Sequence, residues 1–502
     1  MAATFLATMS ERHLLWPAGF KAAGVYAGIK SKATPDVGLL VCPGGATAAA
    51  LFTTNKVVAA PVIVGQRHIA SGRLRGVVVN SGNANACTGK QGMSDAIRMC
   101  QVAASSLNRA TVTLPAINAG SPQEVDLRVQ ALLDLGRSRG YLTYVELNER
   151  LPDEMVSPDK LETLLMLIKQ TGIKLIDEEG ISTLAKNSAG RANLSGYRSN
   201  EFLPSSTGII GHLLPMDKVE AGIAQAAAGL GESEEHALQF ADAIMTTDLR
   251  RKLASAEVRV GRSVVRLAGV CKGSGMIGPR LSGKTGAKHA TMLAYLTTDA
   301  QASPAFLRRT LAVAGDETFN AVTVDDHAST NDTVCLMASG AGGVRLDSAR
   351  AQKAFAAALK DVCQSLAWQI AADGEGATKV VKIVVNGAAN EKAAKAMARA
   401  IAVSPLVKCA MHGNDPNWGR IVSAAGMAGA PFEPDKCTLT LAGTVVFHRG
   451  TPAAFDAAAV SAALKQPEVT AELNCRMGKA AATVWTCDLS KEYVTINADY
   501  HT

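Results

Sequence analysis

Aromatic residues and long hydrophobic runs are the scarcest features of this sequence. Phe, Trp and Tyr together make up 4% of the 502 residues. No run of about 18 apolar residues occurs, which excludes an ordinary membrane-spanning helix. Residues 1–16 contain no long apolar segment, so a secretory signal is not predicted either. We therefore expect a cytoplasmic protein, with the mitochondrion as the alternative compartment.

The sequence also lacks paired cysteine motifs and blocks of basic residues. Its 10 cysteines are scattered and no two form a CxxC pair, which indicates free thiols in a reduced compartment. The net charge of +7 is spread along the chain, so it does not indicate a nucleic acid partner, and an anionic small substrate fits equally well. His327 and His412 lack the paired spacing of metal ligands, so we predict no metal site.

Small residues and alternating strand and helix patterns are abundant instead. Hydrophobic residues make up 48% of the chain and glycine contributes 45 residues, which favours a large core and tight turns. The patterns predict an α/β fold with helices layered on sheets, and short strands in residues 17–105. The expected strands are Val77–Asn80, 200–211, Ser263–Val270, Met292–Thr297, Thr333–Met337, Lys379–Val385 and Thr438–Val446. The expected helices are Gln91–Ser106, Val219–Gly229, Glu232–Thr246, Pro304–Gly315, Ser348–Ala371 and 391–403.

Residues 110–198 differ in composition from the sequence on either side. The stretch 124–180 contains twelve acidic and seven basic side chains in a chain that is basic overall. Its hydrophobic pattern is helical. We therefore expect a small, acidic, helical module inserted between residues 1–109 and residues 199–290.

Ala290 and Thr291 directly precede an apolar strand pattern. A threonine hydroxyl is a weak nucleophile unless a base takes its proton, and the α-amine of an amino-terminal threonine can be that base. This chemistry requires the bond between Ala290 and Thr291 to be cut. Taken alone, the dipeptide is more typical of the simple start of a strand.

Thr207 and Gly208 place a hydroxyl beside a glycine whose backbone N–H can be approached closely. Such a pair is suited to an oxyanion hole, which stabilises the negative charge that develops during acyl transfer. A Ser-Thr-Gly tripeptide is also typical of a turn, and that alternative stays open from the sequence alone.

Three further polar residues are candidates for contacting a substrate. Glu375 lies between two glycines and could meet a substrate amine, while Lys272 could meet a substrate carboxylate. Thr247 lies in a short run of polar residues that could line the same pocket. The alternative is that these segments are loops that face solvent.

Gly278–Thr285 matches the GxxxxGKT pattern of a phosphate-binding loop. That loop needs a buried strand directly before it and a helix directly after it. Here a Gly-Ser-Gly segment at 273–275 intervenes on one side and Gly286 follows on the other. We therefore expect no nucleotide binding, and a solvated insert instead.

Taken together, the motifs resemble those of the glutamate N-acetyltransferase (ornithine acetyltransferase) family. The matching segments follow one another in order along most of the chain. They are GFKAAGVYAGIK (19–30), LFTTNKV (51–57), VVNSGNANACTG (78–89), SSTGIIGHLLPMDK (205–218), IMTTD (244–248), KGSGMI (272–277), ATMLAYLTTDA (290–300), STNDT (329–333), DGEGATK (373–379), DPNWGRI (415–421) and INADYHT (496–502).

This resemblance implies an autoprocessed α/β fold related to the amino-terminal-nucleophile hydrolases. The implied cut between Ala290 and Thr291 gives an α chain, 1–290, and a β chain, 291–502. Thr291 would be the nucleophile, and Thr207 with Gly208 the oxyanion hole. The residues implied around the substrate are Thr247, Lys272, Thr291, Glu375, Asn497 and Thr502.

The implied reaction is a step of arginine biosynthesis. An acetyl group moves from N-acetylornithine to glutamate through an acetyl-Thr291 intermediate, which is ping-pong chemistry without a metal or organic cofactor. Whether acetyl-CoA is a second donor, which would make the enzyme multifunctional, stays open. The resemblance also suggests that the α and β chains associate as α2β2.

The sequence departs from this family in two places. Arg280–His289 is longer than the corresponding family segment and lies directly before the expected cut. Within the 110–198 module, residues 129–180 resemble the amino-terminal autoinhibitory region of bacterial primary sigma factors, most clearly through GYLTYVELNERLPDEMV. The alternative function is therefore a non-enzymatic scaffold that displays this module to a transcription partner. The complete set of catalytic residues favours the enzyme.

Overall fold

The computed structural model describes residues 14–110, 141–143, 174–176, 196–282 and 292–499. The chain divides into two compact units, of which one contains residues 1–106 and 198–502 and the other residues 107–197. The first unit holds two sheets and the second a pair of short strands. No helix within these described ranges is long and apolar enough to cross a membrane.

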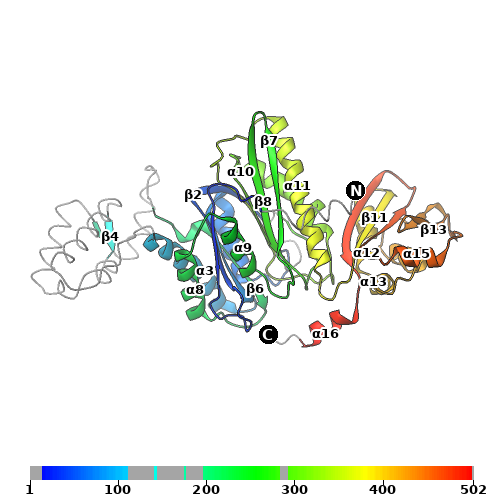
Figure 1. The fold of residues 1–502 in the computed structure, drawn as a ribbon, viewed down its shortest axis with the longest axis horizontal. Helices are drawn as coiled ribbons and strands as arrows, with labels where there is room; N and C mark the ends of the chain where they lie inside the picture. Colours follow the sequence, from blue (N-terminus) through cyan, green and yellow to red (C-terminus); the bar gives the residue numbers. More distant parts are fainter. Residues whose placement is uncertain (1–13, 111–140, 144–173, 177–195, 283–291, 500–502) are drawn as a thin grey trace, which may run out of the picture. The chain divides into compact units, whose positions relative to one another are not determined.

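The larger sheet of the first unit has eight strands (Figure 1). Their order is β6-β3-β2-β10-β9-β8-β7, and β1 pairs with β2 outside this path. β6 is parallel to β3 and β10 is parallel to β9, while the other neighbours are antiparallel. The strands are β1 (Lys21–Val25), β2 (Val37–Phe52), β3 (Arg73–Asn83), β6 (Phe202–Ile209), β7 (Lys252–Val260), β8 (Ser263–Lys272), β9 (Leu293–Thr298) and β10 (Thr333–Ala338).

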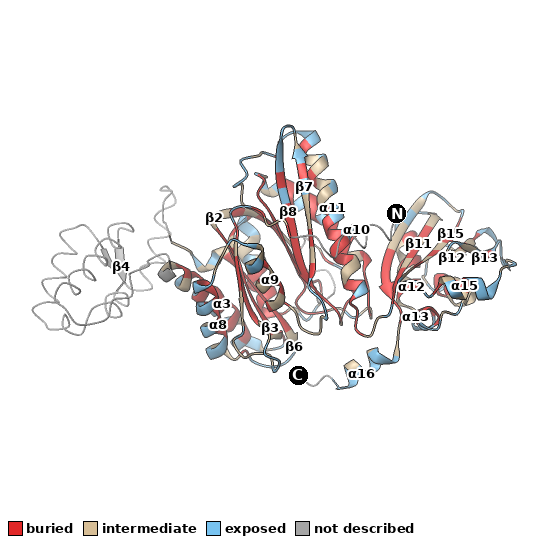
Figure 2. Cartoon of the chain, viewed as in Figure 1, coloured by how far each residue is buried: buried red, intermediate tan, exposed pale blue. Residues whose placement is uncertain are grey.

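Both faces of this sheet are covered, so its central strands are buried along their whole length (Figure 2). In β9, Leu293 and Tyr295 belong to the core cluster that contains Phe240 of α9. Ala294 and Leu296 point the other way, into the cluster formed with α10 and α11. The helices of this part are α2 (Ala60–His68), α3 (Gly89–Ala110), α8 (Met216–Ala228), α9 (Glu234–Ala243), α10 (Pro304–Glu317) and α11 (Ala349–Ala372). The predicted layered α/β architecture is thereby confirmed.

A six-stranded sheet with its own core follows in the sequence, in the order β14-β13-β12-β15-β11-β16. Its strands are β11 (Val380–Ala388), β12 (Thr438–Leu441), β13 (Thr444–His448), β14 (Thr451–Pro452), β15 (Glu468–Asn474) and β16 (Ala480–Cys487). Its helices are α12 (Glu391–Val403), α13 (Pro405–His412), α14 (Trp418–Gly426) and α15 (Ala457–Ala463). The last helix, α16 (Lys491–Asp499), has no buried residue.

The second unit contains a parallel pair of strands, β4 (Tyr141–Thr143) and β5 (Lys174–Ile176). The predicted helical module therefore also contains a short strand pair, which the sequence did not indicate because three-residue strands are too short to show a period of two. The two ends of the unit are joined by Asn108 and Tyr197. The side chain of Asn108 donates to the Tyr197 carbonyl at 3.0 Å and accepts from the Tyr197 N–H at 2.8 Å. The rest of the predicted helices lies outside the described residues.

The expected single strand at Thr438–Val446 is also wrong. The chain instead reverses between β12 and β13, where Ala442 and Gly443 both have positive φ, 47° and 85°. Positive φ at both central residues is the geometry of a tight type I′ turn. Alanine at the first of these positions hides the turn, because Asn or Asp is the usual signal.

The amino-terminal part also differs from the expected series of short strands. β2 runs for 16 residues and continues through a Pro-Gly-Gly segment at 43–45. Its pairing with β3 shifts register between Val41 and Ala46, and this irregularity accommodates the proline within the strand. The pattern gave no prediction for β7, although β7 forms an edge of the same sheet.

Candidate active site

Thr207 and Gly208 lie in β6 and not in a turn. Thr207 is 1% exposed. Gly208 pairs with Gly82 of the parallel strand β3 and has a φ of 131°. A Cβ at Gly208 would come within 2.2 Å of the Gly82 carbonyl carbon, so only glycine lets the two strands approach this closely.

Lys272 is the last residue of β8, and it connects β8 to the end of β6. Its side chain is buried, and Nζ donates a hydrogen bond to Thr207 Oγ1 at 3.2 Å. In the described part of the chain, no carboxylate lies within ion-pair distance of Lys272. Burial lowers the pKa of Lys272, and the negative charge of Asp248 opposes this effect. A buried ammonium with no carboxylate at ion-pair distance among the described residues is well suited to attract an anionic group of a substrate.

A buried ion-pair cluster lies beside Lys272. The ammonium of Lys252 is 2.6 Å from a carboxylate oxygen of Asp248 and 2.6 Å from one of Asp373. Burial opposes ionisation of Asp248, but the positive charges of Lys252 and Lys272 outweigh it and hold the pKa of Asp248 well below its usual range. This cluster joins β7 to the end of α11, which leads directly to Glu375.

Thr247 lies in the segment between α9 and β7, next to this cluster. Asp248 accepts a hydrogen bond from the Thr246 N–H at 3.1 Å and another from the Gly273 N–H at 2.7 Å. The single carboxylate of Asp248 therefore fastens the segment that carries Thr247 to the residue that follows Lys272.

Glu375 contacts the segment that directly follows Lys272. Its backbone N–H donates to the Ser274 carbonyl at 3.1 Å. A Cβ at Gly275 would lie 2.2 Å from a carboxylate oxygen of Glu375, so the carboxylate packs directly on this glycine. The side chain of Asn497, on α16, donates to the same carboxylate at 2.8 Å. The helix α16 thus brings the carboxyl-terminal motif to Glu375.

Asp332, which directly precedes β10, carries a buried carboxyl group. Its Oδ1 accepts a hydrogen bond from the Met292 N–H, and its Oδ2 has no hydrogen-bond partner among the described residues. Burial raises the pKa of Asp332 well above its usual range. Met292 directly precedes β9, so this carboxyl group lies at the start of that strand. In the sequence, Met292 directly follows Thr291, the expected nucleophile.

The structure therefore brings six of the predicted residues into one connected region, through contacts that span most of the first unit. These residues are Thr207, Gly208, Thr247, Lys272, Glu375 and Asn497. Ala290, Thr291 and Thr502 lie outside the described residues. The region offers a hydroxyl, a buried ammonium and a carboxylate, which are the groups that a zwitterionic amino-acid substrate requires.

Sequence reasoning did not single out three charged residues of this region: Lys30, Lys252 and Asp332. Lys252 follows two arginines, and such a basic run normally indicates a solvated surface. Lys30 and Asp332 lie in segments that match the family, but the residues next to them in the sequence do not indicate that they are buried. Their roles depend on contacts between residues far apart in the sequence, which local patterns do not contain.

The other sequence candidates lie elsewhere. His412 contacts Asp488, with Nδ1 2.7 Å from a carboxylate oxygen. Ser282, in the predicted solvated insert, forms an isolated bridge with Phe52 of β2. Within the described ranges, no group of three or more His, Cys, Asp or Glu side chains is arranged to hold a metal ion.

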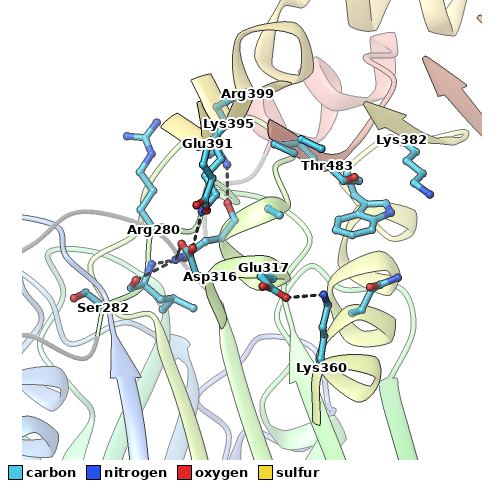
Figure 3. Close-up of a pocket in the computed structure, with 18 residues that line it drawn as sticks. Arg280, Ser282, Asp316, Glu317, Lys360, Lys382, Glu391, Lys395, Arg399 and Thr483 are labelled. Carbon is cyan, nitrogen blue, oxygen red and sulfur yellow. Dashed lines mark hydrogen bonds and ion pairs between the residues drawn. The ribbon is translucent and has the colours of Figure 1, made fainter. Parts of the chain in front are cut away.

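A separate hollow of about 920 Å³ lies between α10, α11, α12 and β16 (Figure 3). None of the predicted site residues lines it. Lys395 is 2.7 Å from Asp316, and Lys360 is 2.6 Å from Glu317, as the dashed lines show. These half-exposed ion pairs contribute little net stability.

Comparison with protein families gives two matches. The ArgJ family profile matches residues 21–120 and 173–502. The profile of Sigma-70 factor, region 1.1, matches residues 123–195, within the second unit. Both resemblances inferred from the sequence are thereby confirmed.

Several individual proteins are similar over the same extent. A protein of Dehalococcoides mccartyi named arginine biosynthesis bifunctional protein ArgJ is 37% identical over 490 residues, covering 97% of this chain and 96% of that protein. The protein of the same name from Symbiobacterium thermophilum is 38% identical over 490 residues, covering 97% of this chain and 98% of its own length.

Two crystal structures are also similar. The arginine biosynthesis bifunctional protein of Bacillus halodurans shares 38% identity and covers 41% of this chain and 97% of its own, with a TM-score of 0.39. Ornithine acetyltransferase of Mycobacterium tuberculosis, complexed with ornithine, shares 28% identity and covers 53% of this chain and 94% of its own, with a TM-score of 0.33.

Proposed function

The chain belongs to the ArgJ family, and from this premise we propose that it is an acetyltransferase of arginine biosynthesis that moves an acetyl group from N-acetylornithine to glutamate. The contact between Lys272 and Thr207 carries the proposal. It joins the oxyanion-hole candidates on β6 to the substrate-binding candidates on β8 and on the segments behind it.

The first half of the reaction uses Thr291 as the nucleophile. Its hydroxyl oxygen attacks the acetyl carbonyl of N-acetylornithine, and its own α-amine takes the hydroxyl proton. Thr207 and the Gly208 N–H stabilise the oxyanion. The carbon–nitrogen bond then breaks, the proton passes to the departing ornithine amine, and an acetyl ester remains on Thr291.

In the second half, glutamate takes the place of ornithine. Its neutral α-amine attacks the ester carbonyl and loses a proton, the Thr291 oxygen leaves and regains a proton, and N-acetylglutamate is released. Lys272 binds the α-carboxylate of either amino acid. Glu375, held by Asn497, faces the reacting amine, with Thr247 and Thr502 completing the enclosure.

The nucleophile becomes available by self-cleavage. Water is consumed when the amide between Ala290 and Thr291 is hydrolysed, leaving a carboxylate on Ala290 and an amine on Thr291. The α chain, 1–290, consists of residues 1–109 and 199–290 with the module 110–198 inserted between them. It stays associated with the β chain, 291–502, in an α2β2 assembly in the cytoplasm, and acetyl-CoA is a second acetyl donor. No organic cofactor or metal takes part.

The scaffold alternative is not favoured. The sigma-like match covers residues 123–195 only, whereas the ArgJ match covers both flanking parts of the chain. A protein that only displayed the module would need neither the buried Lys272 nor the close approach of Gly208 to Gly82.

Steady-state kinetics test the proposal. We expect the purified protein to form N-acetylglutamate from N-acetylornithine and glutamate, with the parallel double-reciprocal lines of a ping-pong mechanism. Thr291→Ala should abolish both self-cleavage and transfer, while Thr291→Ser keeps a hydroxyl and should retain part of both. Undiminished transfer by Thr291→Ala would refute the mechanism.

A further inference from the structure

Two lysines of the candidate site have no carboxylate partner within ion-pair distance in the described part of the chain. Lys272 bonds to the Thr207 hydroxyl at 3.2 Å, and Lys30 bonds to the Met245 carbonyl at 3.1 Å. Lys252, in contrast, lies between two carboxylates. The region therefore holds two lysines without an ion-pair partner among the described residues, and the proposed function uses only Lys272.

The stem of Lys30 lies against the oxyanion-hole strand pair. A Cβ at Gly82 would come 3.0 Å from Lys30 Cγ on one side, while Gly208 packs on the backbone of Gly82. The carbonyl that Lys30 contacts belongs to Met245, two residues before Thr247. The Lys30 ammonium thus lies between the segment that carries Thr247 and the strand pair β3 and β6, which carries Thr207 and Gly208.

The backbone before this lysine is rigidly held. The carboxylate of Asp36 accepts hydrogen bonds from the backbone N–H groups of Ala27 at 2.7 Å, Ile29 at 2.7 Å and Lys30 at 3.1 Å. Asp36 is buried, and these three bonds satisfy its carboxylate. The ammonium of Lys30 has three N–H donors, and its contact with Met245 uses one of them.

We propose that Lys30 binds the side-chain carboxylate of the acceptor glutamate while Lys272 binds its α-carboxylate. This inference rests on the proposed acetyl transfer. Glutamate carries two carboxylates, and the two lysines that form no ion pair with a described residue match them. Ornithine carries an ammonium at the end of its side chain, so Lys30 repels the first product and attracts the second substrate at the same position.

Because Lys30 titrates, its proposed role predicts that the use of glutamate depends on pH. Burial lowers the pKa of Lys30 to about 8, and the negative charges of Asp36 and Asp248 oppose the shift. The other charged groups that act on it are Lys272, which lowers its pKa further, and Asp242, which raises it. Lys30 therefore loses its charge as the pH rises through about 8, and use of glutamate should fall over that range.

The test measures the two half-reactions separately. One is release of ornithine from N-acetylornithine, and the other is glutamate-dependent loss of the acetyl group from the enzyme. Lys30→Met should raise the KM for glutamate roughly 10- to 100-fold, the usual effect of losing one hydrogen bond to a charged group. The KM for N-acetylornithine should not rise. Glutamine, which lacks the side-chain charge, should respond equally to wild type and Lys30→Met.

Two further variants separate binding from a structural role. Lys30→Arg keeps the charge, so it should preserve the KM for glutamate and move the alkaline fall to higher pH. Lys218→Met is the matched control. Lys218 lies on the surface, and its side chain donates a hydrogen bond at 2.8 Å to the carbonyl of Gly28, in the same loop as Lys30. It should leave both half-reactions unchanged.

Equal impairment of both half-reactions by Lys30→Met would overturn the inference, because it would mean that Lys30 only supports the carboxyl end of α9. An unchanged KM for glutamate would overturn it as well. A wild-type protein that transfers no acetyl group would instead remove the proposed function, and this inference with it.

Discussion

Lys252 and Lys272 are both buried lysines, but the groups around them differ. Lys252 lies between the carboxylates of Asp248 and Asp373, so its charge is neutralised within the fold. Lys272 contacts the Thr207 hydroxyl and is free of carboxylate partners within ion-pair distance in the described ranges. At the scale of single residues, Lys252 therefore holds the site together, and Lys272 is the lysine that we propose binds a substrate.

Thr207→Ala should slow acetyl transfer. Removing one oxyanion-hole donor typically costs a factor of about 100 to 1,000 in turnover. Thr207→Ser keeps the hydroxyl near Lys272 and should retain most of the activity. The comparison uses kcat at saturating N-acetylornithine and glutamate. Equal kcat values for the alanine and serine variants would mean that the hydroxyl does not act on the transition state.

Lys252→Met should lower the free energy of unfolding by about 3–5 kcal/mol, since it leaves two buried carboxylates without a counterion. Denaturant titration at neutral pH measures this loss. Lys21→Met is the control, because Lys21 forms an exposed ion pair with Glu232, 3.4 Å away, and such pairs contribute about 0–1 kcal/mol. A loss for Lys252→Met no larger than for this control would contradict the assignment of a buried network.

The same network sets a pH window for the stability of the wild type. The pKa of Asp248 is depressed on folding, so its contribution is present above the unfolded value of about 3.9 and is lost as the pH falls through the folded value. Burial opposes the charge on Lys252, but Asp248 and Asp373 outweigh it and raise its pKa. Its contribution is therefore present below about 10.4 and is lost as the pH rises through the folded value. In the wild type, both contributions are therefore fully present between these limits.

At the scale of elements, the site depends on how closely β6 approaches β3. Gly208→Ala should abolish activity and lower stability, because the new Cβ would meet the Gly82 backbone at 2.2 Å. Gly211→Ala is a matched control: Gly211 also has positive φ, 93°, but a Cβ there meets nothing within 4 Å. Both variants carry a backbone cost of about 1–3 kcal/mol, so the excess loss in Gly208→Ala measures the clash. Thermal unfolding and steady-state turnover of the two variants provide the comparison, and indistinguishable results would contradict this packing.

The sequence predicted elements better than the site. Strong hydrophobic periodicity made α11 and α12 predictable nearly to the residue, and the apolar run of β9 was recognisable because both of its faces are buried. The hairpin of β12 and β13 was missed since alanine occupies its first turn position. The site residues were predictable only through their resemblance to a family. The spatial partners of Lys30 and Lys252 could not be predicted, because Met245 and Asp373 lie far from them in the sequence.

At the scale of the whole molecule, the two ends of the second unit lie together, because Asn108 is hydrogen-bonded to Tyr197. A unit whose ends meet can be removed with little effect on the chain that flanks it. We therefore predict that replacing residues 110–198 by a short Gly/Ser linker preserves acetyl transfer, since halving a loop changes its closure entropy by only about 0.6 kcal/mol. None of the proposed site residues lies in the deleted interval.

Steady-state kinetics of this deletion variant test whether the module contributes to acetyl transfer. The variant must first be shown to cleave itself before Thr291. A fall in turnover of more than about tenfold, equivalent to about 1.4 kcal/mol in the barrier, would show that the module takes part in the enzyme. Unchanged turnover would assign the sigma-like segment a role separate from the transfer of acetyl groups.

The central claim is that Thr291 becomes an amino-terminal nucleophile that carries the acetyl group. Mass spectrometry of the protein incubated with N-acetylornithine but without glutamate tests it most directly. The account predicts a chain that begins at Thr291, heavier by one acetyl group on its first peptide, which loses that group when glutamate is added. An intact chain of 502 residues that transfers acetyl groups without ever carrying one on Thr291 would contradict it.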